Sequence, residues 1–145
     1  MSAAELYQQA IKSLAQGATG HGRLEAPDAV ALADNPLCGD RVEMEVELVA
    51  GRIAALAHRV KGCLLCRAAA SAIGARATGA RLDDIERVAA QLSAMLEQQA
   101  AAPQGWPELD AFAPVHGHRS RYGCVLLPFR ALLEAMKVAS AEAPK

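Results

Sequence analysis

The sequence is poor in aromatic residues, with one Trp, two Tyr and two Phe among 145 residues. A folded core must therefore be built from Leu, Val, Ile and Ala, and Ala is the best intrinsic helix former. The sequence also lacks an excess of either charge, with 15 Lys and Arg against 16 Asp and Glu. This balance gives no reason to expect nucleic acid or an anionic membrane as a partner.

No apolar run approaches the ~18–20 residues of a membrane span. The first residues lack the charged and then apolar pattern of a secretory signal. We therefore expect a cytoplasmic protein with no membrane partner, in a compartment where thiols stay reduced. With 52% hydrophobic residues, the chain suits a single domain over residues 1–145, with a frayed tail from about residue 140.

The strongest strand signal lies in residues 42–48, where apolar residues alternate with Glu43, Glu45 and Glu47. This period of two predicts a strand with one dry face and one wet face that carries the glutamates. Ala50 and Gly51 follow as a hairpin turn, and 53–60 is predicted as the returning strand. With an extended piece at 29–33, the pattern predicts a small three-stranded antiparallel sheet.

Most of the remaining sequence has helical periodicity or is rich in alanine. Between the last two predicted helices, residues 100–118 hold three prolines and two glycines, which indicates a loop with one helical turn around 108–112. The fold class is therefore α+β, with several helices packed against the sheet. The helices are predicted at residues 3–16, 64–77, 82–99 and 125–138.

Three of the four cysteines stand beside a glycine at the predicted end of an element, namely Cys38, Cys63 and Cys124. The chain enters the first strand of the hairpin and leaves the second strand at the same end of the sheet. Cys38 and Cys63 should therefore be neighbours in space. Cys124 joins them if the last helix begins at the same rim. Helix N-termini stabilise thiolates, so we expect a cluster of sulfurs with low pKa values.

Asp40 lies two residues from Cys38 and adds a carboxylate to the three thiols. Four such ligands are the number that a tetrahedral zinc ion, or an iron of an iron–sulfur cluster, requires. A carboxylate is harder and more exchangeable than a fourth thiolate. The set would suit a metal or cluster that is handed on to another protein.

Several alternatives remain open at this point. Cys66 is expected to be a buried core residue, although Cys63 and Cys66 also match the C-x-x-C pattern of a thiol redox protein. A purely structural zinc domain is another reading. His116 and His118 are expected in a solvated loop and are otherwise ligands of a rearranged state. His58 is expected within the sheet.

The segment Asn35-Pro36-Leu37-Cys38-Gly39-Asp40, the Gly62-Cys63 step before an alanine-rich helix and Cys124 at the last helix resemble the NifU/IscU family of iron–sulfur cluster assembly scaffolds. The resemblance extends over roughly residues 5–138. Within the family the chain looks most like the SufU branch. The long step from Cys63 to Cys124 leaves room for the extra segment of that branch, and Arg121 matches its arginine three residues before the last cysteine.

The resemblance implies that Cys38, Asp40, Cys63 and Cys124 form the metal site. It implies zinc and persulfide acceptance from a cysteine desulfurase for a SufU-type protein, or a [2Fe–2S] cluster for an IscU-type protein, with downstream cluster acceptors or carriers as further partners. Cys38 and Cys124 are then the candidate persulfide acceptors, in a non-enzymatic scaffold or a zinc-dependent sulfurtransferase. The chain departs from the family at Gly123 and Lys61, where His or Lys is usual at the first position and His at the second in the SufU type.

Overall fold

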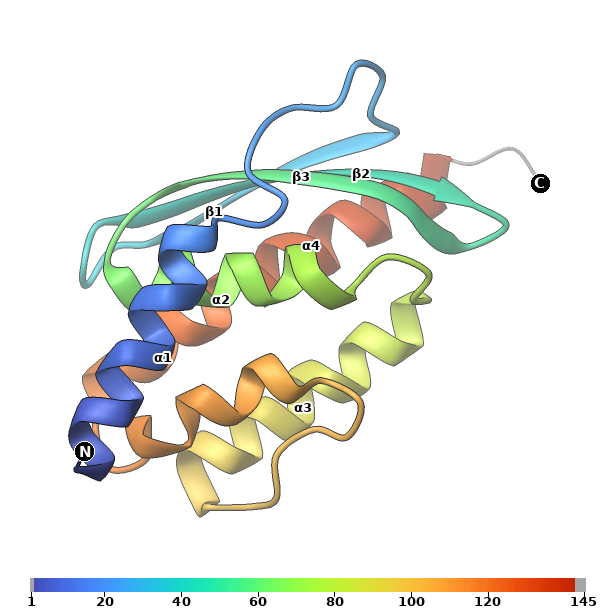
Figure 1. Cartoon of the computed structure of the whole chain (residues 1–145). Helices are drawn as coiled ribbons and strands as arrows, with labels where there is room; N and C mark the ends of the chain where they lie inside the picture. Colours follow the sequence, from blue (N-terminus) through green and yellow to red (C-terminus); the bar gives the residue numbers. More distant parts are fainter. Residues whose placement is uncertain (1, 143–145) are drawn as a thin grey trace.

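The computed structural model describes residues 2–142, which form one three-stranded antiparallel sheet and a helical layer beneath it (Figure 1). The strands are β1 (Ala29–Asn35), β2 (Asp40–Val49) and β3 (Arg52–Lys61), in the order β1-β2-β3. The α+β prediction is confirmed, because the predicted hairpin forms across Ala50 and Gly51 and the strand at 29–33 pairs with β2.

One face of the sheet carries the apolar side chains of β2 into the core. Val42, Met44 and Val46 are fully buried on this face, as their alternation predicts. The register of β2 and β3 slips once, between Glu47 and Leu48. At the end of the hairpin far from its turn, Arg41 pairs with Lys61. This pairing brings Asp40 beside the start of the next helix.

Four α-helices lie on the apolar side of the sheet (Figure 1). Helix α2 packs against β3, and α4 packs against β1 and β2. Helix α1 packs on α2, and α3 packs on α4. None of the helices among the described residues has the length and apolarity needed to cross a membrane. Their bounds are α1 (Ala3–Gly17), α2 (Leu64–Arg76), α3 (Leu82–Gln98) and α4 (Tyr122–Glu142).

Helix α4 is longer than predicted at both ends. It begins at Tyr122 because the 3₁₀ turn η2 (Arg119–Arg121) winds directly into it. It also continues to Glu142, so residues 140–142 of the predicted frayed tail are helical. The rest of that predicted tail, residues 143–145, lies outside the described residues.

The prediction of a single helical turn around residues 108–112 is too short. The structure has a 3₁₀ helix, η1 (Pro107–Val115), which buries Leu109 and Phe112 completely. Just before it, the Trp106 indole N–H donates to the Ala72 carbonyl at 3.1 Å. Its ring also meets Phe129 edge to face at 5.7 Å. The few aromatic residues therefore anchor this proline-rich segment against α2 and α4.

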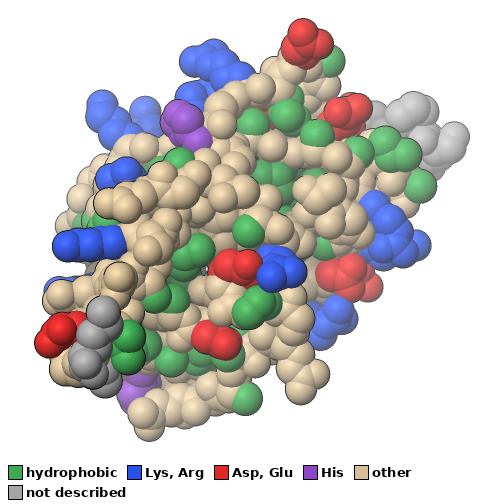
Figure 2. Space-filling view, viewed as in Figure 1, with side chains coloured by type: hydrophobic (Ala, Val, Ile, Leu, Met, Phe, Trp, Pro, Cys, Tyr) green, Lys and Arg blue, Asp and Glu red, His purple; other side chains and the backbone are tan. Residues whose placement is uncertain are grey.

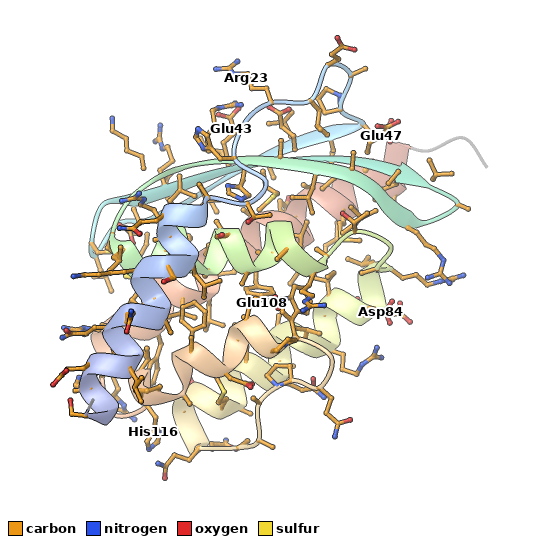
Figure 3. All side chains as sticks on the ribbon, viewed as in Figure 1. Arg23, Glu43, Glu47, Asp84, Glu108 and His116 are labelled. Atoms are coloured by element: carbon orange, nitrogen blue, oxygen red, sulfur yellow. The ribbon has the colours of Figure 1, made fainter. Side chains whose placement is uncertain are left out.

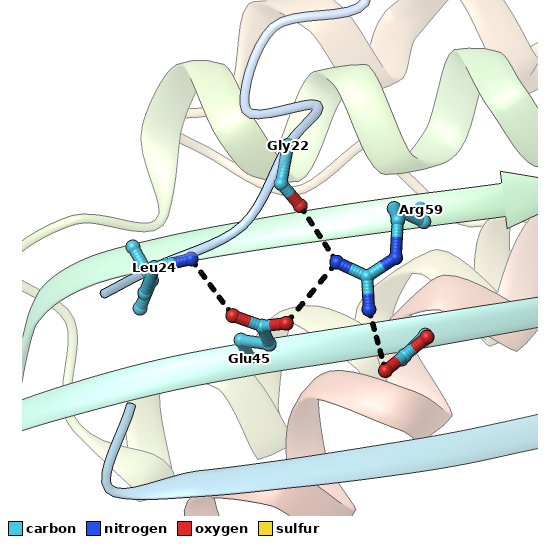
Figure 4. Close-up of polar contacts among 5 residues, drawn as sticks. Gly22, Leu24, Glu45 and Arg59 are labelled. Atoms are coloured by element: carbon cyan, nitrogen blue, oxygen red, sulfur yellow. Dashed lines mark hydrogen bonds and ion pairs between the residues drawn. The ribbon is translucent and has the colours of Figure 1, made fainter. Parts of the chain in front are cut away.

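The outer face of the sheet is only partly wet. Figure 3 shows Glu43 and Glu47 pointing away from the helical layer, whereas the segment after α1 crosses the sheet and covers Glu45. The Glu45 carboxylate accepts the Leu24 N–H at 2.8 Å and pairs with Arg59 at 3.1 Å (Figure 4). The prediction that all three glutamates form a wet face is therefore wrong for Glu45, because a distant loop covers it and supplies one partner while Arg59 of β3 supplies the other.

Charged side chains of both signs are dispersed over the face shown in Figure 2. Asp84 and Glu108 belong to the helical layer in Figure 3, and each carboxylate pairs with an arginine. The distribution agrees with the near-neutral net charge, and the face shown has no extended patch of one sign.

Helix α2 and the segment after α1 touch through backbone atoms at Gly74. A Cβ atom added at Gly74 would lie 1.9 Å from the Thr19 carbonyl oxygen. Only glycine permits this approach, because no real Cβ contact is so short. The contact fixes where the crossing loop leaves α1, and therefore how it reaches the outer face of the sheet.

We predict that Gly74→Ala lowers the free energy of unfolding by about 1–3 kcal/mol, since the backbone must shift to admit one methyl group. Urea denaturation measures the change. Gly17→Ala is the matched control, because its Cβ would meet only Thr19 Oγ1 at an ordinary 3.9 Å, and stability should stay the same or rise by up to about 1 kcal/mol. Equal stability of the Gly74→Ala variant and the wild type would contradict the packing described.

Candidate metal centre

The loop that carries Cys38 is built around Asn35. The Asn35 carbonyl accepts the Gly39 N–H at 2.8 Å, and its side-chain oxygen accepts the Leu37 N–H at 3.2 Å. Gly39 has φ +75°, a left-handed conformation that favours glycine. These bonds explain the turn residues seen in the sequence, and they leave Cys38 exposed at the end of the sheet.

Asp40 begins β2 directly after this loop, and Cys63 follows β3. The Cys63 N–H donates to Asp40 Oδ1 at 3.0 Å, and the Cys63 thiol donates to Asp40 Oδ2 at 3.4 Å. Cys63 is the N-cap residue of α2, with φ −70° and ψ 169°. Both oxygens of the carboxylate are therefore engaged by one residue that lies 23 positions away in the chain.

Cys124 comes to the same place from the last helix. Its Sγ lies 3.4 Å from Cys38 Sγ, and possible ligand atoms of Cys38, Asp40 and Cys124 all lie within 4.8 Å of one another. The structure thus brings together all four groups named from the sequence, with Cys63 joined through Asp40. Cys124 is the third residue of α4 and lies inside the helix, whereas the sequence predicted a helix from residue 125.

The Asp40 carboxylate is only 3% exposed, and it forms no ion pair with a Lys, Arg or His of the described residues. Burial by itself raises the pKa of Asp40. The neighbouring Cys38 thiol, the Cys63 N–H and the Cys124 thiol outweigh burial and hold this pKa below its usual value. A buried carboxylate that stays ionised without a protein counter-charge is suited to a bound cation.

The expected cluster of low-pKa sulfurs is wrong for Cys124. Its side chain is buried, and burial, followed by its contacts with Cys38 and Asp40, raises the pKa of the Cys124 thiol well above its usual value. The low pKa was expected from the position of Cys124 at a helix N-terminus. In the structure Cys124 lies inside the helix and is buried, and burial raises its pKa. In the metal-free chain this thiol keeps its proton, and a metal would have to displace it.

Two glycines make room for the cluster. A Cβ atom at Gly62 would lie 2.6 Å from Asp40 Oδ1, and one at Gly123 would lie 2.8 Å from Asn35 Nδ2. The departure from the family at Gly123 has a local reason here, because the Asn35 amide occupies the space that a side chain would need. The sequence shows glycines beside the cysteines, but it does not show that Gly62 leaves room for Asp40 and Gly123 for Asn35.

The remaining sequence candidates lie away from the cluster or behind it. Cys66 is fully buried, as expected, in the first turn of α2. His58 lies within β3, as expected, and a ring nitrogen contacts the Thr19 carbonyl at 2.7 Å. His116 is not simply solvated, because Nδ1 contacts the Leu96 carbonyl at 2.7 Å. His118 is exposed.

A small antiparallel sheet with helices on one face, and with cysteine and aspartate side chains gathered at its open end, defines an α+β protein with a candidate metal centre. The family model for the NifU-like N terminal domain matches residues 6–105. The chain therefore belongs to the family of NifU-like N-terminal domains.

Individual proteins agree with this assignment. The chain is 28% identical to the iron–sulfur cluster assembly scaffold protein IscU of Streptococcus pyogenes serotype M1, over 91% of this chain and 83% of that protein. It is 22% identical to the protein of the same name from Thermotoga maritima, over 91% and 93% of the two chains. The crystal structure of a nitrogen-fixing NifU-like protein (N-terminal) from Brucella abortus superposes with a TM-score of 0.90, at 28% identity over 96% of this chain and 97% of that one.

We predict that Gly62→Ala weakens zinc binding by about 10–100-fold, the usual cost of disturbing a group that orients a ligand. The added methyl group must push the Asp40 carboxylate away from its present position. Competition with a chromogenic chelator measures the affinity.

Lys61→Ala is the matched control, since it changes the exposed neighbouring residue without adding bulk beside Asp40, and we expect wild-type affinity. Unchanged affinity of Gly62→Ala would show that the position of Asp40 is irrelevant to metal binding.

Proposed function

We propose that this chain is a scaffold for iron–sulfur cluster assembly that receives sulfur from a cysteine desulfurase. Cys38, Asp40, Cys63 and Cys124 would hold the cluster as cargo, or hold zinc in its place. The observation that carries the proposal is the buried, ionised Asp40 carboxylate, which three thiols surround and no basic side chain of the described residues neutralises. The names of the relatives support the same function.

Cys38 is the better of the two candidate persulfide acceptors. Attack on a persulfide that another protein carries requires a thiol that the donor can reach, and it is faster the more readily that thiol ionises. Cys38 lies in an exposed loop, whereas Cys124 is 5% exposed and has a raised pKa. We therefore assign sulfur acceptance to Cys38 and the completion of the ligand set to Cys124.

A groove of about 750 Å³ opens beside the sulfurs and supports delivery by a partner protein. Apolar side chains of Ile11 and Leu65 line it, and Leu37 at its edge is 95% exposed. Lys12 and Arg121 are the charged side chains of its lining, and both are cationic. A protein segment that carries an anionic persulfide would complement this surface.

The branch within the family stays part of the proposal. Arg121 lines the groove, and the two 3₁₀ helices occupy the extra segment between α3 and α4, as a SufU-type protein would have it. A SufU-type site would hold zinc, and an IscU-type site a [2Fe–2S] cluster. We further propose that residues 1–145 form a single scaffold domain that acts in the cytoplasm, where its four free thiols would stay reduced.

We predict that Cys38→Ala lowers both metal occupancy and stimulation of a cysteine desulfurase. Residues that merely support a ligand contribute about 10–100-fold to affinity, so loss of a ligand should cost at least that much. Metal analysis of anaerobically purified protein and a sulfide-production assay measure the two effects.

His118→Ala is the control for this prediction, because His118 is an exposed histidine that the structure leaves outside the cluster. Its metal content and desulfurase stimulation should match the wild type. Full retention of metal by Cys38→Ala, or loss of metal by His118→Ala, would mean that the ligand set is wrong.

A structural zinc domain, the main alternative, makes the opposite prediction about folding. We expect the chain to keep its helical circular dichroism after chelation, because Cys124 is the one site residue in the buried apolar core and all four α-helices contribute side chains to that core. A domain folded by zinc would lose that signal, since metal binding is then folding free energy. Unfolding on chelation would therefore favour the structural alternative over the scaffold.

A further inference from the structure

The function proposed so far leaves one cysteine unused. Cys66 is fully buried on the first turn of α2, three residues after the exposed Cys63. Cys63 is the N-cap residue of that helix and Cys66 is its third residue, the two positions that a capping box joins by side-chain to backbone hydrogen bonds. The Cys63 side chain makes no capping hydrogen bond, and the contact of its thiol with Asp40 Oδ2 at 3.4 Å must break before it can turn toward Cys66.

The distances within a first helical turn suit a disulfide after a small movement. Side chains three positions apart have Cβ atoms ~5–6 Å apart, and a disulfide requires ~3.5–4.5 Å. Rotation of the Cys63 side chain and a slight tightening of the turn would close the gap. Burial raises the pKa of the Cys66 thiol, and the charges of Asp40, Cys63 and Cys38 raise it further, which agrees with a position directly behind the cluster.

The chemistry of cluster assembly gives this pair a use. A persulfide carries sulfur at the oxidation level of the element, whereas a cluster contains sulfide, so two electrons are needed for each sulfur atom. Two thiols supply two electrons when they form a disulfide. Cys63 can receive a sulfur from a persulfide on Cys38, since both thiols neighbour the Asp40 carboxylate.

We propose that Cys66 is the resolving thiol of this scaffold, which converts a persulfide on Cys63 to sulfide within the chain. This inference rests on the proposed function. The Cys66 sulfur loses its proton and attacks Cys63 Sγ, so that a Cys63–Cys66 disulfide forms and the bond from Cys63 Sγ to the terminal sulfur breaks. The terminal sulfur leaves with the bonding electron pair and takes up the proton as hydrogen sulfide.

In this step the Cys66 sulfur is oxidised and the terminal sulfur is reduced, so atoms and electrons balance. The disulfide withdraws Cys63 from the ligand set until an external dithiol reductant restores both thiols. After each release of sulfide, the four-residue ligand set would thus be incomplete until the disulfide is reduced. The opposite assignment, a cysteine that serves only to fill the core, predicts no such coupling.

The test uses metal-free full-length chain and glutathione persulfide as the sulfur donor, without oxygen. We expect the wild type to release sulfide and to contain a Cys63–Cys66 disulfide on peptide mapping. Cys66→Ala should keep the added sulfur as a persulfide and release sulfide at least about tenfold more slowly, because it lacks the attacking thiol.

Ser71→Ala is the control, because it also removes one buried side-chain atom from α2, the oxygen that accepts the Thr19 N–H, but no thiol. It should release sulfide at the wild-type rate. Wild-type release from Cys66→Ala, or a disulfide that maps to Cys38 and Cys124 in the wild type, would overturn the proposal. Mapping of the wild type decides the question even if Cys66→Ala folds poorly.

The outcome is independent of metal and of the desulfurase, because neither is present. Loss of metal binding in Cys38→Ala, together with fast sulfide release from Cys66→Ala, would leave the scaffold function standing and remove only the resolving role. Retention of metal binding by Cys38→Ala, together with slow sulfide release from Cys66→Ala, would reject the proposed metal site and retain the thiol exchange.

Discussion

The site depends on the pairing of β2 with β3 at the open end of the hairpin. Because Arg41 lies opposite Lys61, Asp40 comes beside Gly62 and Cys63, and its carboxylate can accept both the N–H and the thiol of Cys63. A slip of one residue would turn the apolar side chains of β2 out of the core. The buried face therefore enforces the register, and the register places the carboxylate. Packing of Met44 and its neighbours thus determines where the chemistry occurs.

Sequence patterns predicted the features that arise from neighbouring residues. The alternation in 42–48 predicted the hairpin, and the glycine beside Cys63 predicted the start of α2. The convergence of Cys38, Asp40 and Cys63 followed from the hairpin alone. Features that depend on distant segments were not visible. Glu45 is buried because a loop after α1 crosses it, and Gly62 matters because a carboxylate from another strand approaches it.

Cys124 shows where such reasoning reaches its limit. The sequence predicted that Cys124 lies near Cys38, but it did not predict that Cys124 is buried. Its burial depends on how η2 leads into α4 and on where α4 crosses the sheet. The consequence is chemical. Two exposed thiols and one buried thiol do not form an equivalent set, so a donor protein would reach Cys38 or Cys63 more readily than Cys124. The proposed function would thereby divide sulfur entry and metal retention among different cysteines.

The position of the cluster at the rim also separates binding from folding. Phe112, Phe129 and Leu127 are among the largest fully buried side chains, and they lie in η1 and α4 and close the core without a ligand. Asp40 belongs to the last pair of β1 with β2, opposite Asn35, and Cys38 lies in the turn between them, which is held by its own hydrogen bonds. A ligand bound there would add to a structure whose core is already closed. We therefore expect its release to leave the fold in place, which is the physical condition for passing a cluster to another protein.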